Sequence, residues 1–236
     1  MTRRDDLDHL YALFDDLETR VGGMRTLDEC TGYMDWPERG LYVFFAADER
    51  RTGSDQRRVT RVGTHAVSSG SGTTLWSRLR THRGANRGTY EGGGNHRGSV
   101  FRERVGEAML VRDGLGEQFP SWGDGSSANR ELRLDELPHE RRVSEYVRSL
   151  PFLWVRVDDE PGPESDRAFL ERNLIALVSN DGRSACDQRD DSWLGHHSES
   201  EKIRESGLWN VNHVDGSYDP SFLDRFAEAV GETTPP

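Results

Sequence analysis

The clearest β-strand signal in this chain is the segment Gly40-Leu41-Tyr42-Val43-Phe44-Phe45-Ala46-Ala47, and the fold prediction starts from it. It is rich in residues that favour β-structure and is long enough to form a buried strand. The polar residues 48–56 that follow it are typical of a hairpin connection. Residues 57–64, built around Val59 and Val62, have the character of a return strand. The sequence therefore predicts a β-hairpin here.

Helices are expected on both sides of this hairpin along the chain. Residues 5–21 carry apolar side chains at the i, i+3, i+4 spacing of an amphipathic helix, and Thr73 or Thr74 can cap a helix over residues 75–82. The other predicted elements are a segment at 100–111 where helix is favoured over strand, a helix at 136–149, a strand at 152–157, and helices at 165–179 and 220–230. The six glycines of residues 84–98 predict a flexible loop.

This order of elements predicts an α+β fold, with a small, mostly antiparallel three-stranded sheet flanked by helices. A length of 236 residues suits one domain with extensions, or at most two small ones. We divide the chain into an N-terminal helical extension (1–36), a core (37–180) and a C-terminal extension packed on the core (181–236). The end of the chain before the last helix is irregular and rich in Trp and His.

The charge of the chain is unevenly distributed. The net charge is −11, yet residues 76–104 hold seven arginines and two glutamates, and a basic patch on an acidic body can bind phosphates. The alternative is a general preference for arginine, since Lys202 is the only lysine. Cys30 and Cys186 form no CxxC pair, which argues against a disulfide framework or zinc module. The absence of a long apolar run and the acidic N-terminus predict a cytoplasmic protein with no membrane segment; no protein partner is predicted.

Glu171 is an acidic residue at a position where an apolar one is expected. Around the predicted helix 165–179, the apolar side chains form one arc, and Glu171 falls inside it. An ionised carboxylate in such a place costs several kcal/mol unless it is paired or binds a metal. Arg167 lies in the same arc one turn earlier, so it is an alternative partner for Glu171, although its long side chain could also reach solvent.

Three other polar positions can carry chemistry. Arg78 and His82 are four residues apart and share a helix face, where a guanidinium can grip phosphate oxygens beside an imidazole. Tyr42 lies in the middle of the first strand, and His96 follows three glycines that let a backbone approach a ligand closely. Each has a purely structural alternative. Arg78 and His82 could lie on a solvated helix face, Tyr42 could be a core residue, and His96 could lie in a flexible surface loop.

Together these residues resemble the GIY-YIG nuclease superfamily, over roughly residues 40–180. The family pattern is a Gly-Ile-Tyr strand, a Tyr-Ile-Gly strand, a helix with Arg and often His, and, after a third strand, a helix with a metal-binding Glu. The corresponding segments are Gly40-Leu41-Tyr42, Arg61-Val62-Gly63, Arg78 with His82, and Glu171. Arg61 replaces the second tyrosine, and the stretch between Arg78 and Glu171 is longer than in minimal members. For the Asn that usually follows the Glu we choose Asn180, with Asn210 and Asn212 as rivals.

The resemblance implies one divalent metal, Mg²⁺ or Mn²⁺, held by Glu171 and waters. It implies that Arg78 stabilises the transition state and that Tyr42 is the general base. A free phenol ionises only near pH 10, so Arg61 or Arg78 must favour its ionised form. His82 or His96 is the alternative base.

The implied function is a metal-dependent endonuclease that hydrolyses nucleic-acid phosphodiester bonds, with double-stranded DNA as the expected partner. The backbone phosphates would be contacted by Arg80, Arg83, Arg87, Arg97 and Asn180. Two other interpretations stay open. One is an inactive nucleic-acid-binding module with the same fold, and the other is a cytoplasmic scaffold without enzymatic activity.

Overall fold

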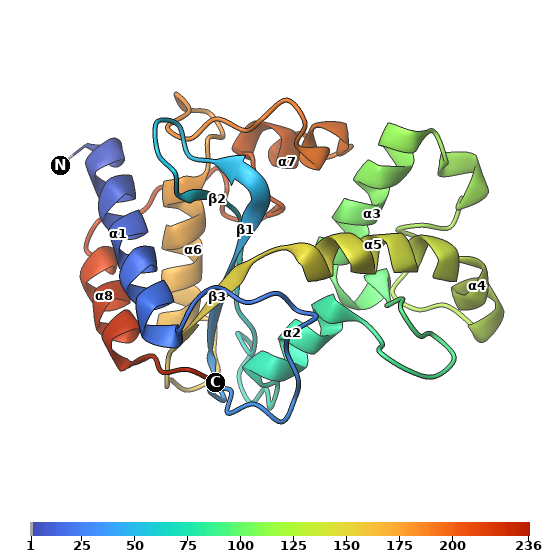
Figure 1. Cartoon of the computed structure of the whole chain (residues 1–236), viewed down its shortest axis with the longest axis horizontal. Coiled ribbons are helices and arrows are strands. Elements are labelled where there is room, and N and C mark those ends of the chain that lie inside the picture. Colours follow the sequence, from blue (N-terminus) through green and yellow to red (C-terminus); the bar gives the residue numbers. More distant parts are fainter. Residues whose placement is uncertain (1) are drawn as a thin grey trace.

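The computed structural model describes residues 2–236 and has the predicted α+β architecture. Its centre is an antiparallel sheet in the order β2-β1-β3, formed by β1 (Gly40–Arg50), β2 (Arg57–Gly63) and β3 (Phe152–Arg156). The predicted hairpin is therefore confirmed, and the third strand joins it on the far side of β1. The central strand β1 is buried over its first seven residues, because helices cover both faces of the sheet (Figure 1).

One face is covered by α1 (Arg3–Val21), α6 (Asp166–Val178) and α8 (Phe222–Glu232), which lie on the same side of the sheet in Figure 1. Phe14 of α1 makes edge-on aromatic contacts with Phe45 of β1 at 5.4 Å and with Phe226 of α8 at 5.7 Å between ring centroids. The first and last helices thus belong to one hydrophobic core with the sheet. The division into a core and two extensions stays a prediction.

The opposite face supports α2 (Leu75–Arg83), α3 (Val100–Asp113) and α5 (Leu137–Ser149), and α4 (Arg130–Asp135) precedes α5. Phe44 of β1 packs against Phe101 of α3 at 5.4 Å. The choice of helix for residues 100–111 is confirmed. Thr74 caps α2, since its side chain accepts a hydrogen bond from the backbone of Ser77. Short helical turns complete the chain at η1 (His96–Gly98), η2 (Gly116–Gln118), η3 (Leu194–His197) and α7 (Glu201–Ser206).

The segment between α2 and α3 differs from the flexible loop that its glycines predict. Ala85 and Gly93 are joined by a backbone hydrogen bond of 2.8 Å, and Gly92 donates to the Ala85 carbonyl at 3.0 Å. Gly84 has a φ of +80°, and a Cβ on it would lie 2.2 Å from the Gly93 carbonyl oxygen. Glycine is therefore needed here for a tight, hydrogen-bonded turn, which sequence composition does not distinguish from a mobile loop.

The Trp- and His-rich segment, residues 193–213, covers the free edge of β2. The backbone N–H of Trp209 donates to the Thr60 carbonyl at 2.7 Å. The side-chain amide of Asn210 pairs with both backbone groups of Val62, accepting at 3.1 Å and donating at 2.8 Å. An uncovered strand edge would present unpaired backbone groups, so this segment acts as a substitute for a fourth strand. Among residues 2–236, no helix combines the length and apolar character needed to cross a bilayer.

Candidate active site

The hairpin places Tyr42 and Arg61 on the face of the sheet that carries α2 and α3. Tyr42 is paired across the strands with Gly63, and Arg61 with Phe44. A Cβ at position 63 would lie 2.3 Å from the Tyr42 hydroxyl oxygen. Glycine at the end of the Arg-Val-Gly segment therefore leaves the space in which the phenol lies. Both Tyr42 and Arg61 are buried.

Helix α2 brings His82 into direct contact with Tyr42. The Nε2 atom of His82 is 2.8 Å from the Tyr42 hydroxyl oxygen, and its Nδ1 atom is 2.8 Å from the Ser99 hydroxyl at the start of α3. Burial holds the pKa of His82 well below its usual value, and the charges of Arg78, Arg61 and Arg102 act in the same direction. His82 is therefore neutral in the folded chain.

Glu171 lies where α6 meets the end of β2. Its Oε1 atom accepts a hydrogen bond of 3.0 Å from the backbone N–H of Thr64. Arg167 is not its partner, because it is fully buried, forms an ion pair with Asp159 and donates to the His65 carbonyl at 2.6 Å. Both sequence-based alternatives for Arg167, a salt bridge to Glu171 and a side chain reaching solvent, are wrong. Within residues 2–236, no basic side chain lies within 4.0 Å of the Glu171 carboxylate.

The charged groups of these elements share one electrostatic environment. Burial raises the pKa of Glu171, and the charge of Arg61, the Thr64 N–H and the charge of Arg78 oppose this rise. Burial lowers the pKa of Arg61, against the influence of Tyr42 and Glu171. The pKa of Arg78 is raised, chiefly by its charge interaction with Tyr42. The charges carried by β2, α2 and α6 therefore influence one another's pKa values.

The turn after β2 is fixed by contacts that the sequence does not reveal. The Thr64 hydroxyl donates to the Gly40 carbonyl at 2.9 Å, and His65 Nδ1 is 2.8 Å from the Thr73 carbonyl. Ala66 has a φ of +53°, an uncommon backbone conformation for alanine. The Arg167 guanidinium donates a hydrogen bond to the His65 carbonyl. This clamp points the Thr64 N–H at Glu171, and no spacing pattern could have identified its members.

His96 does not join this group. It is buried, its Nδ1 atom is 3.0 Å from a Glu140 carboxylate oxygen, and its ring stacks on Trp122 at 3.9 Å. The backbone N–H of Gly123 lies 3.2 Å from its other ring nitrogen. Both ring nitrogens are committed inside the protein, so the prediction of His96 as a general base is wrong. The glycines before it permit close packing rather than access to a ligand.

The basic stretch 76–104 is not one continuous basic surface. Arg97 forms a two-point ion pair with Glu136 at 2.6 and 2.8 Å, and Arg102 is fully buried against Glu140. Arg97 is therefore corrected from a nucleic-acid contact to a structural residue. Of the other predicted contacts, Arg80 and Arg87 are exposed.

Two more predicted contacts are engaged inside the protein. Arg83 is half-buried, donates to the Cys30 carbonyl at 2.6 Å and lies over the Trp76 ring. Asn180 is buried, and its amide donates to the Asp187 carbonyl at 2.8 Å. Asn180 is therefore wrong as a nucleic-acid contact, because its amide joins α6 to the C-terminal segment. Its rival Asn210 is likewise committed, to the edge of β2.

The side chains near Glu171 suit a divalent cation that keeps most of its water ligands when it binds. No group of three or more His, Cys, Asp or Glu side chains arranged to hold a metal occurs in the described part of the chain. Glu171 offers a hard carboxylate oxygen with only one contact, to the Thr64 N–H. Magnesium prefers oxygen ligands and commonly keeps several waters beside one or two carboxylates. The residues present therefore fit a single aquated Mg²⁺ or Mn²⁺ ion.

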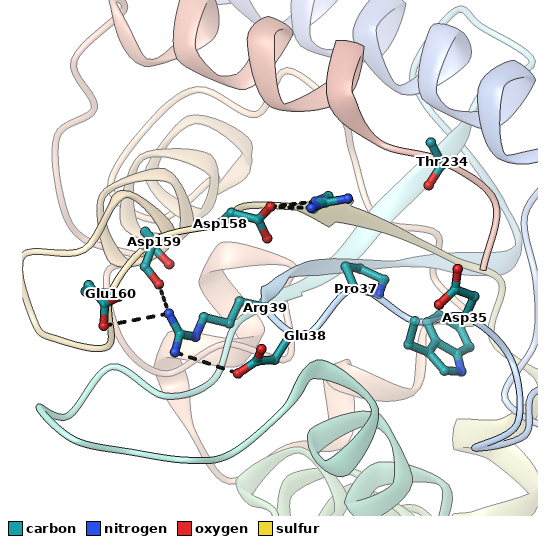
Figure 2. A pocket seen from close by; sticks show the side chains of 10 residues that line it. Asp35, Pro37, Glu38, Arg39, Asp158, Asp159, Glu160 and Thr234 are labelled. Atoms are coloured by element: carbon teal, nitrogen blue, oxygen red, sulfur yellow. Dashed lines mark hydrogen bonds and ion pairs between the residues drawn. The ribbon is translucent and has the colours of Figure 1, made fainter.

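A cavity of about 720 Å³ lies elsewhere, between the start of β1 and the loop after β3 (Figure 2). Arg39 pairs there with Glu38 at 3.7 Å and with Glu160 at 3.9 Å, and Arg156 pairs with Asp158. The remaining lining residues are Asp35, Trp36, Pro37, Asp159 and Thr234. Acidic side chains outnumber basic ones, so this cavity is unsuited to phosphate groups.

Tyr42, Arg78 and Glu171 lie on β1, α2 and α6 in the order of the GIY-YIG pattern, and β2 carries Arg61 where the pattern has a second tyrosine. The sequence profile of the GIY-YIG domain matches residues 1–236. The chain therefore belongs to the GIY-YIG domain family, whose members are generally nucleases acting on nucleic acid. No curated protein and no solved structure matches the chain.

Proposed function

We propose that this protein is a metal-dependent endonuclease that hydrolyses phosphodiester bonds in double-stranded DNA. The observation that carries the proposal is Glu171. It is a largely buried carboxylate with no ion-pair partner among residues 2–236, beside Arg61, Arg78 and Tyr42. A carboxylate kept in such a place is costly, and a divalent cation would offset that cost.

The cation would be Mg²⁺ or Mn²⁺ bound by Glu171 and waters. When bound, such an ion neutralises charge on a phosphate and on the departing oxygen. The backbone N–H of Thr64 holds one carboxylate oxygen at 3.0 Å and so restricts how the carboxylate can turn. Glu171 lies on the helix after the third strand, which is where the family pattern has its metal-binding Glu.

Each of the other residues has a proposed role. Arg78 is partly exposed, and its planar guanidinium can donate two hydrogen bonds to phosphate oxygens as their charge grows. Tyr42 takes a proton from the attacking water. Arg61 is buried beside it and contributes a positive charge to its surroundings. Arg61 stands where the family pattern has a second tyrosine, so this chain has a guanidinium group there in place of a phenol.

The surface for DNA is proposed around α2, through Arg80 and Arg87, which are exposed, and with a lesser contribution from Arg83. Contacts of this kind hold the backbone without reading sequence. Because the stretch 76–104 offers fewer free arginines than its composition suggests, binding should be modest and strongly weakened by salt. A DNA substrate is in keeping with the proposed cytoplasmic location.

A plasmid-nicking assay tests the proposal. The wild-type chain should nick supercoiled DNA with Mg²⁺ or Mn²⁺ and not after EDTA treatment, and Glu171→Gln should lower the rate at least about 10²-fold. Thermal unfolding should be unchanged or slightly raised in Glu171→Gln, because the buried charge is removed. Glu164→Gln, on the exposed loop before α6, is the matched control and should nick normally. Nicking that survives both EDTA and Glu171→Gln would refute the proposal.

A second candidate function is a binding module without catalysis, and the observation favouring it is the replacement of the second motif tyrosine by Arg61. Such a module would retard DNA in a salt-dependent way without cutting it. Glu171→Gln would then bind DNA at least as well as the wild type, since it removes negative charge.

A further inference from the structure

One helix, α6, holds the turn after β2 at two points. Glu171 accepts the backbone N–H of Thr64 at 3.0 Å. One helical turn earlier, Arg167 donates to the His65 carbonyl at 2.6 Å and reaches the Ala66 carbonyl at 3.5 Å. Residues four apart lie on the same face of a helix, so both side chains extend from α6 to this turn. The position of the Thr64 N–H therefore depends on how Arg167 holds the next two residues.

Ala66 has a backbone conformation that alanine does not adopt without support. Its φ of +53° lies in the left-handed region, where the β-carbon of an L-residue crowds a backbone carbonyl oxygen. Such a conformation persists only where the surrounding contacts impose it, and these positions cluster at functional sites. The carbonyls of His65 and Ala66 belong to the two peptide groups that flank the Ala66 Cα. By donating to both, Arg167 fixes the two backbone angles of this residue.

Arg167 is itself oriented by the loop after β3. It is fully buried, and its guanidinium pairs with Asp159, whose Oδ2 atom also accepts the Arg167 backbone N–H at 2.9 Å. The Asp159 carbonyl in turn accepts a hydrogen bond from Arg39, just before β1 (Figure 2). A buried ion pair is weak evidence for net stability. What this pair does is direct the guanidinium at the two carbonyls of the turn.

The result for Glu171 is a carboxylate held at one oxygen only. The Thr64 N–H contacts Oε1, and no other hydrogen bond to the Glu171 carboxylate occurs among residues 2–236. A backbone N–H on one oxygen restricts rotation of the group and leaves Oε2 to face a cation in a set direction. Groups that orient a metal ligand in this way change metal affinity by about 10–100-fold when they are removed.

We propose that Arg167 is a positioning residue for the divalent cation. It holds Ala66 in its strained conformation, which places the Thr64 N–H on one oxygen of Glu171 and directs the other oxygen to the metal. The proposal rests on the proposed function, since the cation belongs to that function. It assigns a role to the arginine in the apolar arc of α6, although that arginine forms no ion pair with Glu171.

The first test measures Mn²⁺ binding by the full chain without DNA, from the electron paramagnetic resonance signal of the free ion. Arg167→Lys keeps the charge beside Asp159, but a single ammonium group cannot also hold both carbonyls. We expect its Mn²⁺ affinity to fall about 10-fold. Arg172→Lys, on the same helix and with its guanidinium over the Phe169 ring, is the matched control and should bind Mn²⁺ as the wild type does. Wild-type affinity in Arg167→Lys would overturn the proposal.

A second variant separates positioning from stability. Ala66→Gly should leave Mn²⁺ affinity unchanged and the melting temperature unchanged or raised, because glycine adopts a positive φ without strain. In the double variant Arg167→Lys/Ala66→Gly, the turn no longer needs Arg167 to hold a strained residue, so most of the lost affinity should return. A merely structural role for Arg167 predicts that the double variant recovers stability but not affinity, and that result would contradict the proposal.

The last test reads the turn itself and needs no metal. In hydrogen–deuterium exchange, the Thr64 amide should exchange faster in Arg167→Lys than in the wild type, while the amides of α1 keep their rates and so exclude general unfolding. Unchanged exchange at Thr64 would refute the proposal. A wild-type chain that binds no Mn²⁺ would overturn both the proposal and the metal-dependent function. Mn²⁺ binding that follows these expectations in a chain that never nicks DNA would overturn the proposed function alone.

Discussion

Two clusters of polar and charged side chains in this molecule are organised differently. We call the first the site cluster, which consists of Tyr42, Arg61, Arg78 and Glu171. We call the second the insert cluster, which consists of His96, Arg97, Arg102, Glu136 and Glu140. In the insert cluster each guanidinium nitrogen of the two arginines donates to a carboxylate, carbonyl or hydroxyl oxygen. In the site cluster the Nε atoms of Arg61 and Arg78 have no partner among residues 2–236.

We interpret this difference as one between a structural network and the proposed site. Burial acts to raise the pKa of Glu140, but the hydrogen bond from His96 and the charge of Arg102 outweigh it and hold the value at about 2. For Glu171 the balance is reversed, and burial leaves its pKa raised. A buried carboxylate paired with a cation has its charge balanced inside the protein, whereas one without a cation carries a desolvation cost that a bound ion would offset.

The largest effect is expected in the insert cluster, from Arg102→Met. This variant leaves Glu140 buried without its cation, and breaking such a pair should lower the free energy of unfolding by about 3–5 kcal/mol. Urea-induced unfolding measures the change. Arg104→Met is the control, because Arg104 pairs with Glu107 and Glu103 at a partly exposed surface and should cost at most about 1 kcal/mol. Equal losses in the two variants would mean that the insert cluster is no more than a surface network.

The next largest effect is expected in the site cluster and concerns activity. Arg78→Lys keeps the charge but loses the planar pair of donors, so nicking should fall about 10²-fold with little change in stability. Arg80→Lys, on the same helix but exposed, should alter the nicking rate only slightly. A large loss of stability in Arg78→Lys would place Arg78 with the structural arginines and erase the contrast between the clusters.

A smaller effect on stability is expected when the pH is lowered, and a histidine near each of the two clusters contributes to it. Burial lowers the pKa of His65, in the turn beside the site cluster, and of His139, beside the insert cluster, to about 4 in each case. In the unfolded chain both would bind a proton near pH 6.5. The unfolded state therefore holds more protons between pH 6.5 and 4, and stability falls as the pH is lowered through this window. The melting temperature followed across this range should decline steadily.

His139→Phe distinguishes the two contributions to this decline. The replacement removes one of the titrating histidines and keeps an aromatic ring against Phe119 and Trp122. Its melting temperature should depend less steeply on pH between 6.5 and 4 than that of the wild type. An unchanged slope would assign the acid sensitivity to His65 and other groups.

Much of the fold followed from the sequence because local periodicity carries it. The β-forming composition and length of residues 40–47, the spacing of apolar residues in α1 and the apolar arc of α6 each predicted an element within a few residues of its observed bounds. The same regularity exposed Glu171, because a carboxylate inside an apolar arc departs from the pattern. Its motif neighbours, Tyr42 and Arg78, were identified by their order along the chain.

The partners of each charge were decided only by the tertiary structure. Glu171 meets the Thr64 backbone across 107 residues of sequence, and Arg102 meets Glu140 across 38. Arg97 and Arg102 look like their neighbours Arg80 and Arg87 in the sequence, yet the first two are enclosed by carboxylates and the other two face solvent. A side chain's type and spacing determine which element it belongs to, whereas its charge balance depends on distant elements that pack around it. The sequence thus specified the sheet, the helices and the identity of the unusual carboxylate, and only the packing shows which charges are already paired inside the protein.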